Sequence, residues 1–395
     1  MKYAIIVPDG AADLPIDELG GKTPLQAAVT PNMDWIASHG KCGQVRNVPQ
    51  GMYPGSDVAL LSVMGYDPRQ YYTGRAPLEA AAQGLKVDPD EWIFRCNLVT
   101  IIDGVMEDHS AGHITTEEGA AIVADLNKLL GGPNVKFFTG VSYRHLLTFR
   151  ANCDVTTTPP HDILGKKAAP YLPTGAGADL LRAMIDTSRR MLENHDVNVV
   201  RRDLGENPAT SIWLWGQGKM PQLPTFIERF GLRGASITAV DLIRGLSKLI
   251  GWESIEVPGA TGYIDTNYAG KGQAAIEAID RVDVVLVHVE APDETGHNAD
   301  VKAKVQAISD IDKYVVGPIL KRLQAEGDQW RILVLPDHPT PCSVRTHTAE
   351  PVPFAIAGLR IAGVVQEPFS ETTAANSDLK ISHGHELMEF FLRAH

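Results

Sequence analysis

The chain has 395 residues, which is too long for one ordinary core, and at about 150 residues per domain we expect two domains. With 44% apolar and 21% charged residues the composition is that of a globular protein, and no apolar run approaches the roughly 20 residues that a membrane span needs. The net charge of -12 argues against sequence-independent nucleic-acid binding, which relies on Lys and Arg, but it is compatible with a small anionic substrate.

The N-terminus and the cysteines indicate where the protein works. The first apolar stretch stops at Pro8-Asp9-Gly10, which is too short for the core of a secretory signal. The cysteines contain no C-x-x-C pair, so neither a zinc ribbon nor a disulfide framework is indicated. We therefore expect a cytoplasmic protein with reduced thiols and no membrane partner. The oligomeric state is not indicated.

Short apolar runs alternate with helical patterns along most of the chain. Runs of Val, Ile and Leu without polar alternation predict strands that are buried on both faces, as in a parallel sheet covered by helices. The expected elements are, in chain order, strand 3–7, helix 30–39, helix 56–64, strand 94–102, helix 116–130, strand 143–149, helix 178–193, strand 212–215, helix 240–250, strand 282–289, helix 301–326 and strand 332–335.

The middle of the chain is interpreted as an insertion, because the candidate functional residues with the clearest pattern lie before and after it. Residues 1–80 and 207–395 would form one discontinuous metal-binding domain in which strands and helices alternate. Residues 81–206 would form a smaller inserted α/β domain. Within it, the segment 156–174 is dense in Pro, Thr and Gly and predicts a long surface loop.

Three of the predicted strands are followed by residue types that bind metals. Asp9 follows the first strand, Asp293 and His297 follow the strand 282–289, and Asp337-His338 follow the strand 332–335. Because sites in open parallel sheets collect beyond the carboxyl ends of strands, we expect these side chains to converge on a dinuclear metal site. Carboxylates and imidazoles without thiolates suit manganese, zinc, cobalt or magnesium, and the residues do not discriminate among these ions.

Two further residues have an ordinary interpretation beside a functional one. Ser56 follows Pro54-Gly55 and stands where a helix N-cap belongs, whereas as a nucleophile it would need a base or a metal to lower its hydroxyl pKa. The sequence contains no Gly-x-Ser-x-Gly elbow, which favours a metal as the activator. His347 is either a loop histidine or a further metal ligand.

Taken together, these motifs resemble the alkaline-phosphatase superfamily, and more closely the archaeal-type 2,3-bisphosphoglycerate-independent phosphoglycerate mutases. The resemblance covers essentially the whole chain and includes Val-Pro-Asp9-Gly-Ala-Ala-Asp, Pro-Gly-Ser56-Asp and Tyr-Tyr-Thr-Gly-Arg75-Ala-Pro-Leu-Glu-Ala. It implies an alkaline-phosphatase-like fold, with a mostly parallel sheet covered by helices and an inserted smaller α/β domain that binds substrate and acts as a lid.

The resemblance also implies a role for each residue of the site. Ser56 would form a phosphoserine while 3-phosphoglycerate becomes 2-phosphoglycerate, without 2,3-bisphosphoglycerate. Manganese is the first expectation for the two divalent ions, with zinc, cobalt or magnesium as alternatives. The implied ligands are Asp9, Ser56, Asp337 and His338 for one ion and Asp293, His297 and His347 for the other.

Charge counting adds a need for basic residues. Two divalent ions are balanced by three aspartates and one serine alkoxide, so the phosphate and carboxylate of the substrate require other partners, of which guanidinium groups are the best suited. The candidates are Arg75 and, from the inserted domain, Arg144, His109 and His113.

Three rival functions remain open. A related phosphotransferase, such as the proposed homoserine kinases, or a metal-dependent phosphomonoesterase could use the same scaffold, although no P-loop or kinase Gly-rich loop supports an ATP site. A metal-stabilised binding protein would not need the hydroxyl of Ser56.

Overall fold

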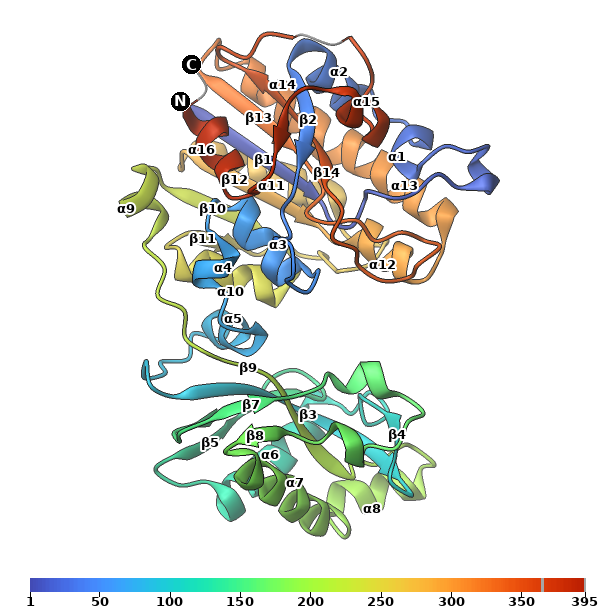
Figure 1. Cartoon of the computed structure of the whole chain (residues 1–395), viewed down its shortest axis with the longest axis vertical. Helices are drawn as coiled ribbons and strands as arrows, with labels where there is room; N and C mark the ends of the chain where they lie inside the picture. The colour runs from blue at the N-terminus through green and yellow to red at the C-terminus, as the bar shows by residue number, and fades with distance from the viewer. Residues whose placement is uncertain (364–365, 394–395) are drawn as a thin grey trace. The chain divides into compact units, whose positions relative to one another are not determined.

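The structure, a computed structural model, describes residues 1–363 and 366–393 and divides into two compact units (Figure 1). The discontinuous unit comprises Met1–Tyr72 and Gln222–His395, and the inserted unit comprises Thr73–Pro221. The inserted unit therefore begins before and ends after the predicted segment 81–206. The reason is that helix α5 (Arg75–Ala82) and strand β9 (Ser211–Lys219) both pack with strand β3 (Trp92–Ile102).

The assignment of the strand at 212–215 to the first domain was wrong. Strand β9 pairs antiparallel with β3 along most of its length, with Leu214 opposite Cys96. Its apolar run resembles that of a buried parallel strand, and only the pairing partner decides to which sheet it belongs.

The discontinuous unit is built on an eight-stranded sheet in the order β11-β10-β12-β1-β13-β14-β2-β15. Strand β14 is antiparallel to both neighbours, and the other pairs are parallel, which confirms the predicted mostly parallel sheet. The strands are β1 (Lys2–Pro8), β2 (Lys41–Val45), β10 (Gly234–Ile237), β11 (Glu253–Ile255), β12 (Val284–Val289), β13 (Trp330–Val334), β14 (Val352–Gly358) and β15 (Lys380–Ile381).

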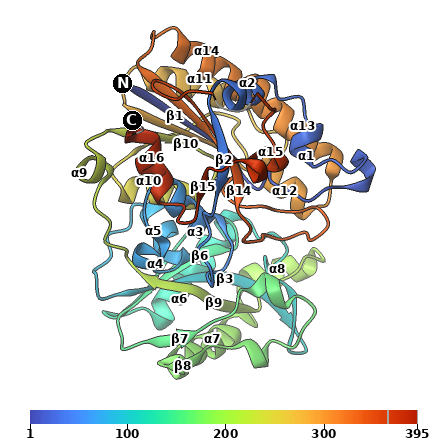
Figure 2. The ribbon, with the colours of Figure 1, turned by 45° about the horizontal axis from the view of Figure 1, so that its top comes forward.

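Helices cover both faces of this sheet (Figures 1 and 2). The main core lies on one face, where Ile6 and Val287 pack with apolar residues of α2, α11, α13 and α14. On the other face Tyr3 packs against Phe391 of α16. The helices are α1 (Pro24–Ala27), α2 (Pro31–His39), α3 (Ser56–Val63), α4 (Pro68–Tyr71), α9 (Phe226–Phe230), α10 (Asp241–Leu249), α11 (Tyr268–Ile279), α12 (Ala291–His297), α13 (Val301–Ile311), α14 (Gly317–Gln324), α15 (Glu371–Asn376) and α16 (Glu386–Arg393).

The predicted helix at 301–326 is present but contains a π-helical turn at Asp312–Val316. The Asp312 carboxylate accepts hydrogen bonds from the backbone N–H groups of Asn32 and Met33, at the start of α2. Pro318, which has no N–H to donate, follows at the start of α14. The spacing of apolar residues predicts neither the π-helical turn nor the new helix that starts near Pro318, because the apolar repeat continues through the turn.

The inserted unit consists of an antiparallel sheet with helices packed against it. Strands β3, β4 (Val105–Asp108), β5 (Val135–Phe138), β6 (Arg144–Phe149) and β9 form the sheet, and β7 (Asp154–Thr156) pairs with β8 (Thr174–Ala176). The helices are α6 (Thr116–Leu130), α7 (Ala178–Leu192) and α8 (Asp196–Asp203), and α6 and α7 match the predicted helices. The segment 156–174 lies mostly at the surface, as predicted, and Ile163 and Ala168 anchor it in an apolar cluster with Trp213.

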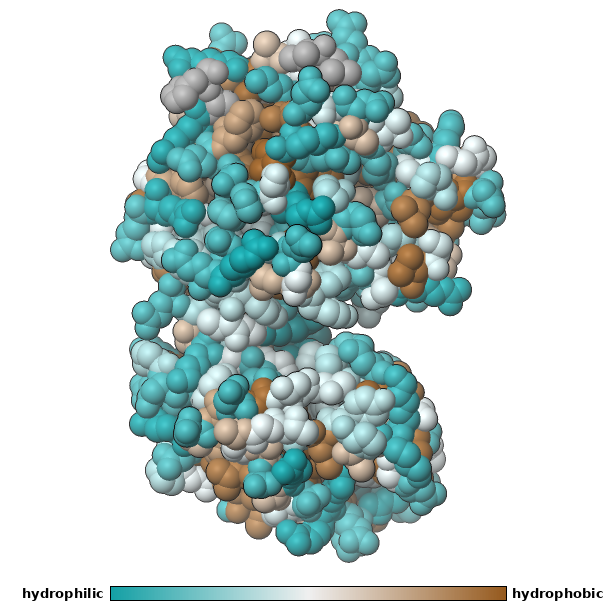
Figure 3. Space-filling view, viewed as in Figure 1, coloured by the Kyte–Doolittle hydropathy of each residue, from teal (hydrophilic) through white to brown (hydrophobic). Residues whose placement is uncertain are grey.

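The exterior agrees with the composition. Hydrophilic residues cover most of the surface of each unit on the face shown in Figure 3. Among the described residues we find no helix whose length and apolar character would let it traverse a bilayer. All four cysteines are buried and free.

A buried ion pair links α13 to the loop after β1. Lys304 Nζ lies 2.9 Å from Asp13 Oδ2, both side chains are fully buried, and Nζ also donates to the backbone carbonyl of Thr340. Removing one partner of such a pair leaves the other charge buried and uncompensated.

We expect the substitution Lys304→Met to lower the free energy of unfolding by about 3–5 kcal/mol, measured by urea denaturation. Lys302→Met on the same helix is the matched control, because Lys302 is exposed, and it should change stability by no more than about 0.5 kcal/mol. Equal losses in the two variants would contradict the importance of the buried pair.

Candidate dinuclear metal site

Three neighbouring strands bring the predicted ligands to one edge of the sheet. Strand β1 pairs in parallel with β12 on one side and β13 on the other, so their carboxyl ends lie together. Asp9 follows β1, Asp293 stands on α12 just after β12, and Asp337 follows β13. Asp293 and His297 are on one helical turn, so the helical alternative for the Asp-x-x-x-His segment is the one that the structure adopts.

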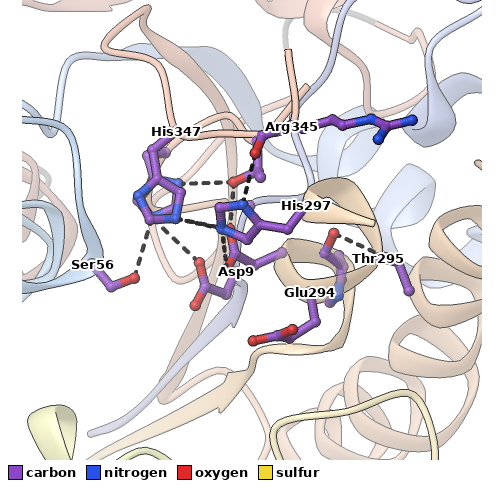
Figure 4. A network of polar contacts seen from close by, with 12 residues as sticks. Asp9, Ser56, Glu294, Thr295, His297, Arg345 and His347 are labelled. Atoms are coloured by element: carbon purple, nitrogen blue, oxygen red, sulfur yellow. Dashed lines mark hydrogen bonds and ion pairs between the residues drawn. The ribbon is translucent and has the colours of Figure 1, made fainter. Parts of the chain in front are cut away.

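Asp293, His297 and His347 form one group of potential ligands. The Nε2 atoms of the two imidazoles are 2.9 Å apart, and each is 3.3 Å from a carboxylate oxygen of Asp293. Figure 4 shows the two rings facing one another with Asp9 and Ser56 beside them. These three side chains converge on a common point although His347 is 50 residues from His297 along the chain.

Backbone carbonyls orient both imidazoles of this group. His297 Nδ1 lies 3.0 Å from the carbonyl oxygen of Arg345, and His347 Nδ1 lies 3.2 Å from that of Pro54. A carbonyl only accepts, so each Nδ1 carries the hydrogen and donates it. When both rings are neutral, the lone pairs of the two Nε2 atoms point at one another, and a cation between them would stabilise this arrangement. Donation of Nδ1–H to a carbonyl is usual for metal-binding histidines.

A second group lies deeper and contains Asp9, Asp337, His338 and Ser56. His338 Nε2 is 3.6 Å from Asp9 Oδ1, 3.4 Å from Asp337 Oδ2 and 3.2 Å from Ser56 Oγ. Asp9 Oδ1 and Asp337 Oδ2 are buried and have no hydrogen-bond partner among the described residues. Buried oxygen atoms without a donor are costly, and a divalent cation would satisfy them, so the residues fit the implied metal.

The carboxylates also repel one another. Burial, together with the charges of Asp337 and Asp293, raises the pKa of Asp9 well above its usual value. Burial would also raise the pKa of Asp293, but hydrogen bonds from His297 and His347 outweigh this effect and lower it well below the usual value. Without a bound cation, therefore, protons on nearby groups compensate part of the negative charge.

Ser56 is the first residue of α3, and the prediction that it is the N-cap was wrong. The N-cap is Gly55, and no side-chain cap is present at this helix. The Ser56 hydroxyl faces His338 instead, while Asp57 Oδ1 accepts the N–H of Val58. The hydroxyl is therefore available for chemistry beside the positive end of a helix dipole.

Sequence reasoning missed His288 of β12. Its imidazole is completely buried, and Nε2 lies 3.0 Å from Asp9 Oδ2. Burial lowers the pKa of His288 to about 3, so the ring is neutral near pH 7. The available signal is one imidazole inside an otherwise apolar strand, Val-Val-Leu-Val-His-Val.

The four predicted substrate-binding residues belong to the inserted unit. His109 and Arg144 both contact the ring of Tyr143, with His109 at a centroid distance of 5.8 Å and the Arg144 guanidinium also at 5.8 Å from the centroid. Arg75 begins α5 and is partly exposed. His113 is exposed on the loop after β4. His109 and Arg144 thus share Tyr143 as a common neighbour.

Three more residues of the inserted unit extend this group and were not predicted. The His161 ring lies between those of His109 and Trp215, at centroid distances of 6.2 Å and 5.4 Å. The Arg95 guanidinium stacks on Trp215, 4.2 Å from its centroid, and pairs with Glu79 at 3.0 Å. A signal existed for Arg95, a charged residue in the apolar strand Trp-Ile-Phe-Arg-Cys, whereas His161 lies in an irregular segment with none.

We expect cation binding at the Asp293 group to release protons. The hydrogen bond with Asp293 raises the pKa of His297 to about 9, so this imidazole is protonated at pH 7 and a cation must displace its proton. Affinity should therefore fall by about tenfold for each pH unit below 9.

Calorimetric titration with Mn²⁺ in buffers of different ionisation enthalpy measures the protons released. The variant His297→Gln should release about one proton fewer than the unmodified chain at pH 7. A heat of binding that is independent of the buffer would contradict this expectation.

Comparison with known proteins agrees with the site. Residues 37–198 match the sequence family described as 2,3-bisphosphoglycerate-independent phosphoglycerate mutase. A protein of that name from Methanothrix thermoacetophila is 51% identical over 392 residues, covering 99% of this chain and 100% of the relative. A probable enzyme of this name from Geobacter sulfurreducens is 48% identical over 398 residues, covering 99% and 100%.

Solved structures also match over the whole chain. A protein from Pyrococcus horikoshii has a TM-score of 0.84 at 30% identity, covering 99% of this chain and 96% of the other. A cofactor-independent phosphoglycerate mutase from Thermoplasma acidophilum has a TM-score of 0.65 at 27% identity, covering 99% of both. The chain therefore belongs to the family of 2,3-bisphosphoglycerate-independent phosphoglycerate mutases.

Proposed function

We propose that this protein interconverts 3-phosphoglycerate and 2-phosphoglycerate through a phosphoserine at Ser56, without 2,3-bisphosphoglycerate. The observation that carries the proposal is the position of Ser56 Oγ, 3.2 Å from Nε2 of His338, a residue that belongs to one of three overlapping groups of potential metal ligands. Family membership supports the reaction. A cytoplasmic location remains our expectation from the sequence.

Two divalent cations would complete the site, with manganese as the first expectation. Asp9, Ser56, Asp337 and His338 would hold one, and Asp293, His297 and His347 the other. When bound, the cations would neutralise the buried carboxylates and the negative charge that develops on the phosphoryl group. Oxygen and imidazole donors without thiolates are compatible with manganese, cobalt, zinc or magnesium.

The chain's own residues then account for the transfer. Ser56 Oγ attacks phosphorus while the bond between phosphorus and the glycerate 3-oxygen breaks, and the proton lost from Ser56 is balanced by the one that the 3-oxygen gains. Glycerate reorients, and its 2-oxygen attacks the phosphoserine. This second displacement restores the Ser56 hydroxyl and yields 2-phosphoglycerate.

The family resemblance implies a role in substrate binding for the inserted unit. We propose Arg75, Arg144, His109 and His113 as partners of the substrate phosphate and carboxylate. Stacking of Arg95 on Trp215 supports this proposal, because it holds a further guanidinium close to the ring of His161.

The loop that carries His109 and His113 has the strain expected of a recognition element. Ala111, Gly112 and His113 have φ angles of 50°, 67° and 51°. This left-handed conformation costs about 1–3 kcal/mol for a residue other than glycine, which applies to Ala111 and His113. Arg201 holds the loop by donating to the carbonyls of Ala111 and Gly112. Such strain persists where surrounding structure enforces it, typically at functional sites.

Incubation of Mn²⁺-loaded protein with 3-phosphoglycerate, without 2,3-bisphosphoglycerate, should yield 2-phosphoglycerate with negligible free phosphate. Chelation should abolish the conversion, and Mn²⁺ or Co²⁺ should restore it. Phosphate release alone would identify a phosphomonoesterase instead. If neither product forms, the proposal is wrong, and homoserine with ATP is the next substrate pair to assay.

We expect Ser56→Ala to reduce turnover by a factor on the order of 10³ to 10⁶, because it removes the nucleophile. Ser38→Ala is the control, since Ser38 donates to Asp34 within α2 and should tolerate the change. Circular dichroism checks that both variants are folded. Unchanged turnover in Ser56→Ala would exclude the phosphoserine mechanism.

A further inference from the structure

His288 is a buried polar side chain whose Nε2 atom lies beside the Asp9 carboxylate but makes no hydrogen bond among the described residues. It stands in β12 opposite Val7 of β1, and its side chain is completely excluded from solvent. An unsatisfied buried nitrogen of this kind is destabilising, so its presence in a central strand requires an explanation.

The Nε2 atom of His288 belongs to a set of three potential ligand atoms. Asp9, His288 and Asp337 each offer one atom, and these atoms lie within 4.8 Å of one another. His288 Nε2 is 3.0 Å from Asp9 Oδ2, which is the separation of two donors at right angles on one cation about 2.1 Å from each. Asp9 Oδ1 and Asp337 Oδ2 are buried without hydrogen-bond partners as well.

The rest of each side chain is oriented so that these atoms remain available. Asp337 Oδ1 accepts hydrogen bonds from the backbone N–H groups of Gly10 and His338, and Oδ2 makes no hydrogen bond among the described residues. His288 Nδ1 is 3.5 Å from Thr238 Oγ1, a hydroxyl oxygen able to accept a hydrogen from the ring. A ring that donates through Nδ1 presents the lone pair of Nε2, as metal-binding histidines do.

A neighbouring lysine fixes the strand end on which His288 stands. Lys271 of α11 is fully buried, and its Nζ donates to the backbone carbonyl of His288 at 3.1 Å. The imidazole is therefore held on a rigid element rather than on a loop.

We propose that His288 is an additional ligand of the inner cation, the one held by Asp9, Ser56, Asp337 and His338. The inference rests on the proposed dinuclear site and extends its donor set from four protein groups to five. Five protein donors exceed the four of a tetrahedral zinc site and favour an ion that accepts higher coordination, such as Mn²⁺ or Co²⁺.

The test compares the full chain with His288→Leu, which removes the nitrogen donor but keeps an apolar side chain in the strand. Mn²⁺ binding is measured by calorimetry, and the visible spectrum of the Co²⁺-loaded protein reports coordination number. We expect the affinity for one of the two bound ions to fall by at least about tenfold. We also expect the Co²⁺ absorption to intensify, because fewer ligands remain.

Two results would overturn the proposal. Affinity and spectrum could both remain unchanged, or affinity could fall while the spectrum stays the same, which would mean that His288 only positions Asp9. If the unmodified chain binds no cation, the dinuclear site itself fails, and this result is separate from the effect of the substitution.

Two further variants control for folding. His145→Leu replaces a buried imidazole of the inserted unit and should leave both readouts unchanged. If His288→Leu does not fold, as judged by circular dichroism, the smaller polar variant His288→Asn is measured in the same way, with the same expected and contradicting results.

Discussion

The repulsion among three buried carboxylates is the constraint on which the rest of the site depends. Asp9, Asp293 and Asp337 are 1%, 5% and 1% exposed, at one edge of a sheet whose strands are apolar. Burying one ionised carboxylate is expensive, and burying three together requires positive charge. The histidines around them, the raised pKa of Asp9 and the unpaired oxygens are all consequences of this arrangement.

A polar network behind the carboxylates holds them in place. Thr340 Oγ1 contacts Asp293 Oδ1 at 2.5 Å, and the backbone carbonyl of Thr340 accepts a hydrogen bond from Lys304 Nζ. Asn47 Nδ2 donates to the carbonyl of Asp337 at 2.9 Å. Because these contacts hold the segments that carry Asp293 and Asp337, the geometry of the site does not depend on a bound ion alone.

The division of the chain separates two kinds of chemistry. Among the described residues, the discontinuous unit holds Ser56 and the groups of potential metal ligands, in which Asp9, Asp293 and Asp337 come directly after central strands. The inserted unit holds the arginines and histidines proposed to select the substrate, on an antiparallel sheet with its own core. Related chemistries could therefore arise by changes in the inserted unit while the carboxylates stay unaltered.

The sequence by itself determined the class of the sheet, most of the helices and the residues that meet at its edge. Apolar runs without alternation have one stable environment, the middle of a covered parallel sheet, and parallel strands end at a common edge. The sequence therefore predicts that Asp9, Asp293 and Asp337 lie close together. Periodicity also located α6, because its capping box and apolar repeat are local signals.

Only the tertiary structure decided the pairing of β9, the first residue of α3 and the position of His288. Strand β9 is apolar enough for either sheet, so its pairing with β3, rather than its own residues, decides to which sheet it belongs. Ser56 is the first helical residue rather than the cap, and its hydroxyl faces His338, across 282 residues of sequence. His288 became a candidate ligand because β12 lies beside β1, and pairing between distant strands is a long-range property that no local pattern encodes.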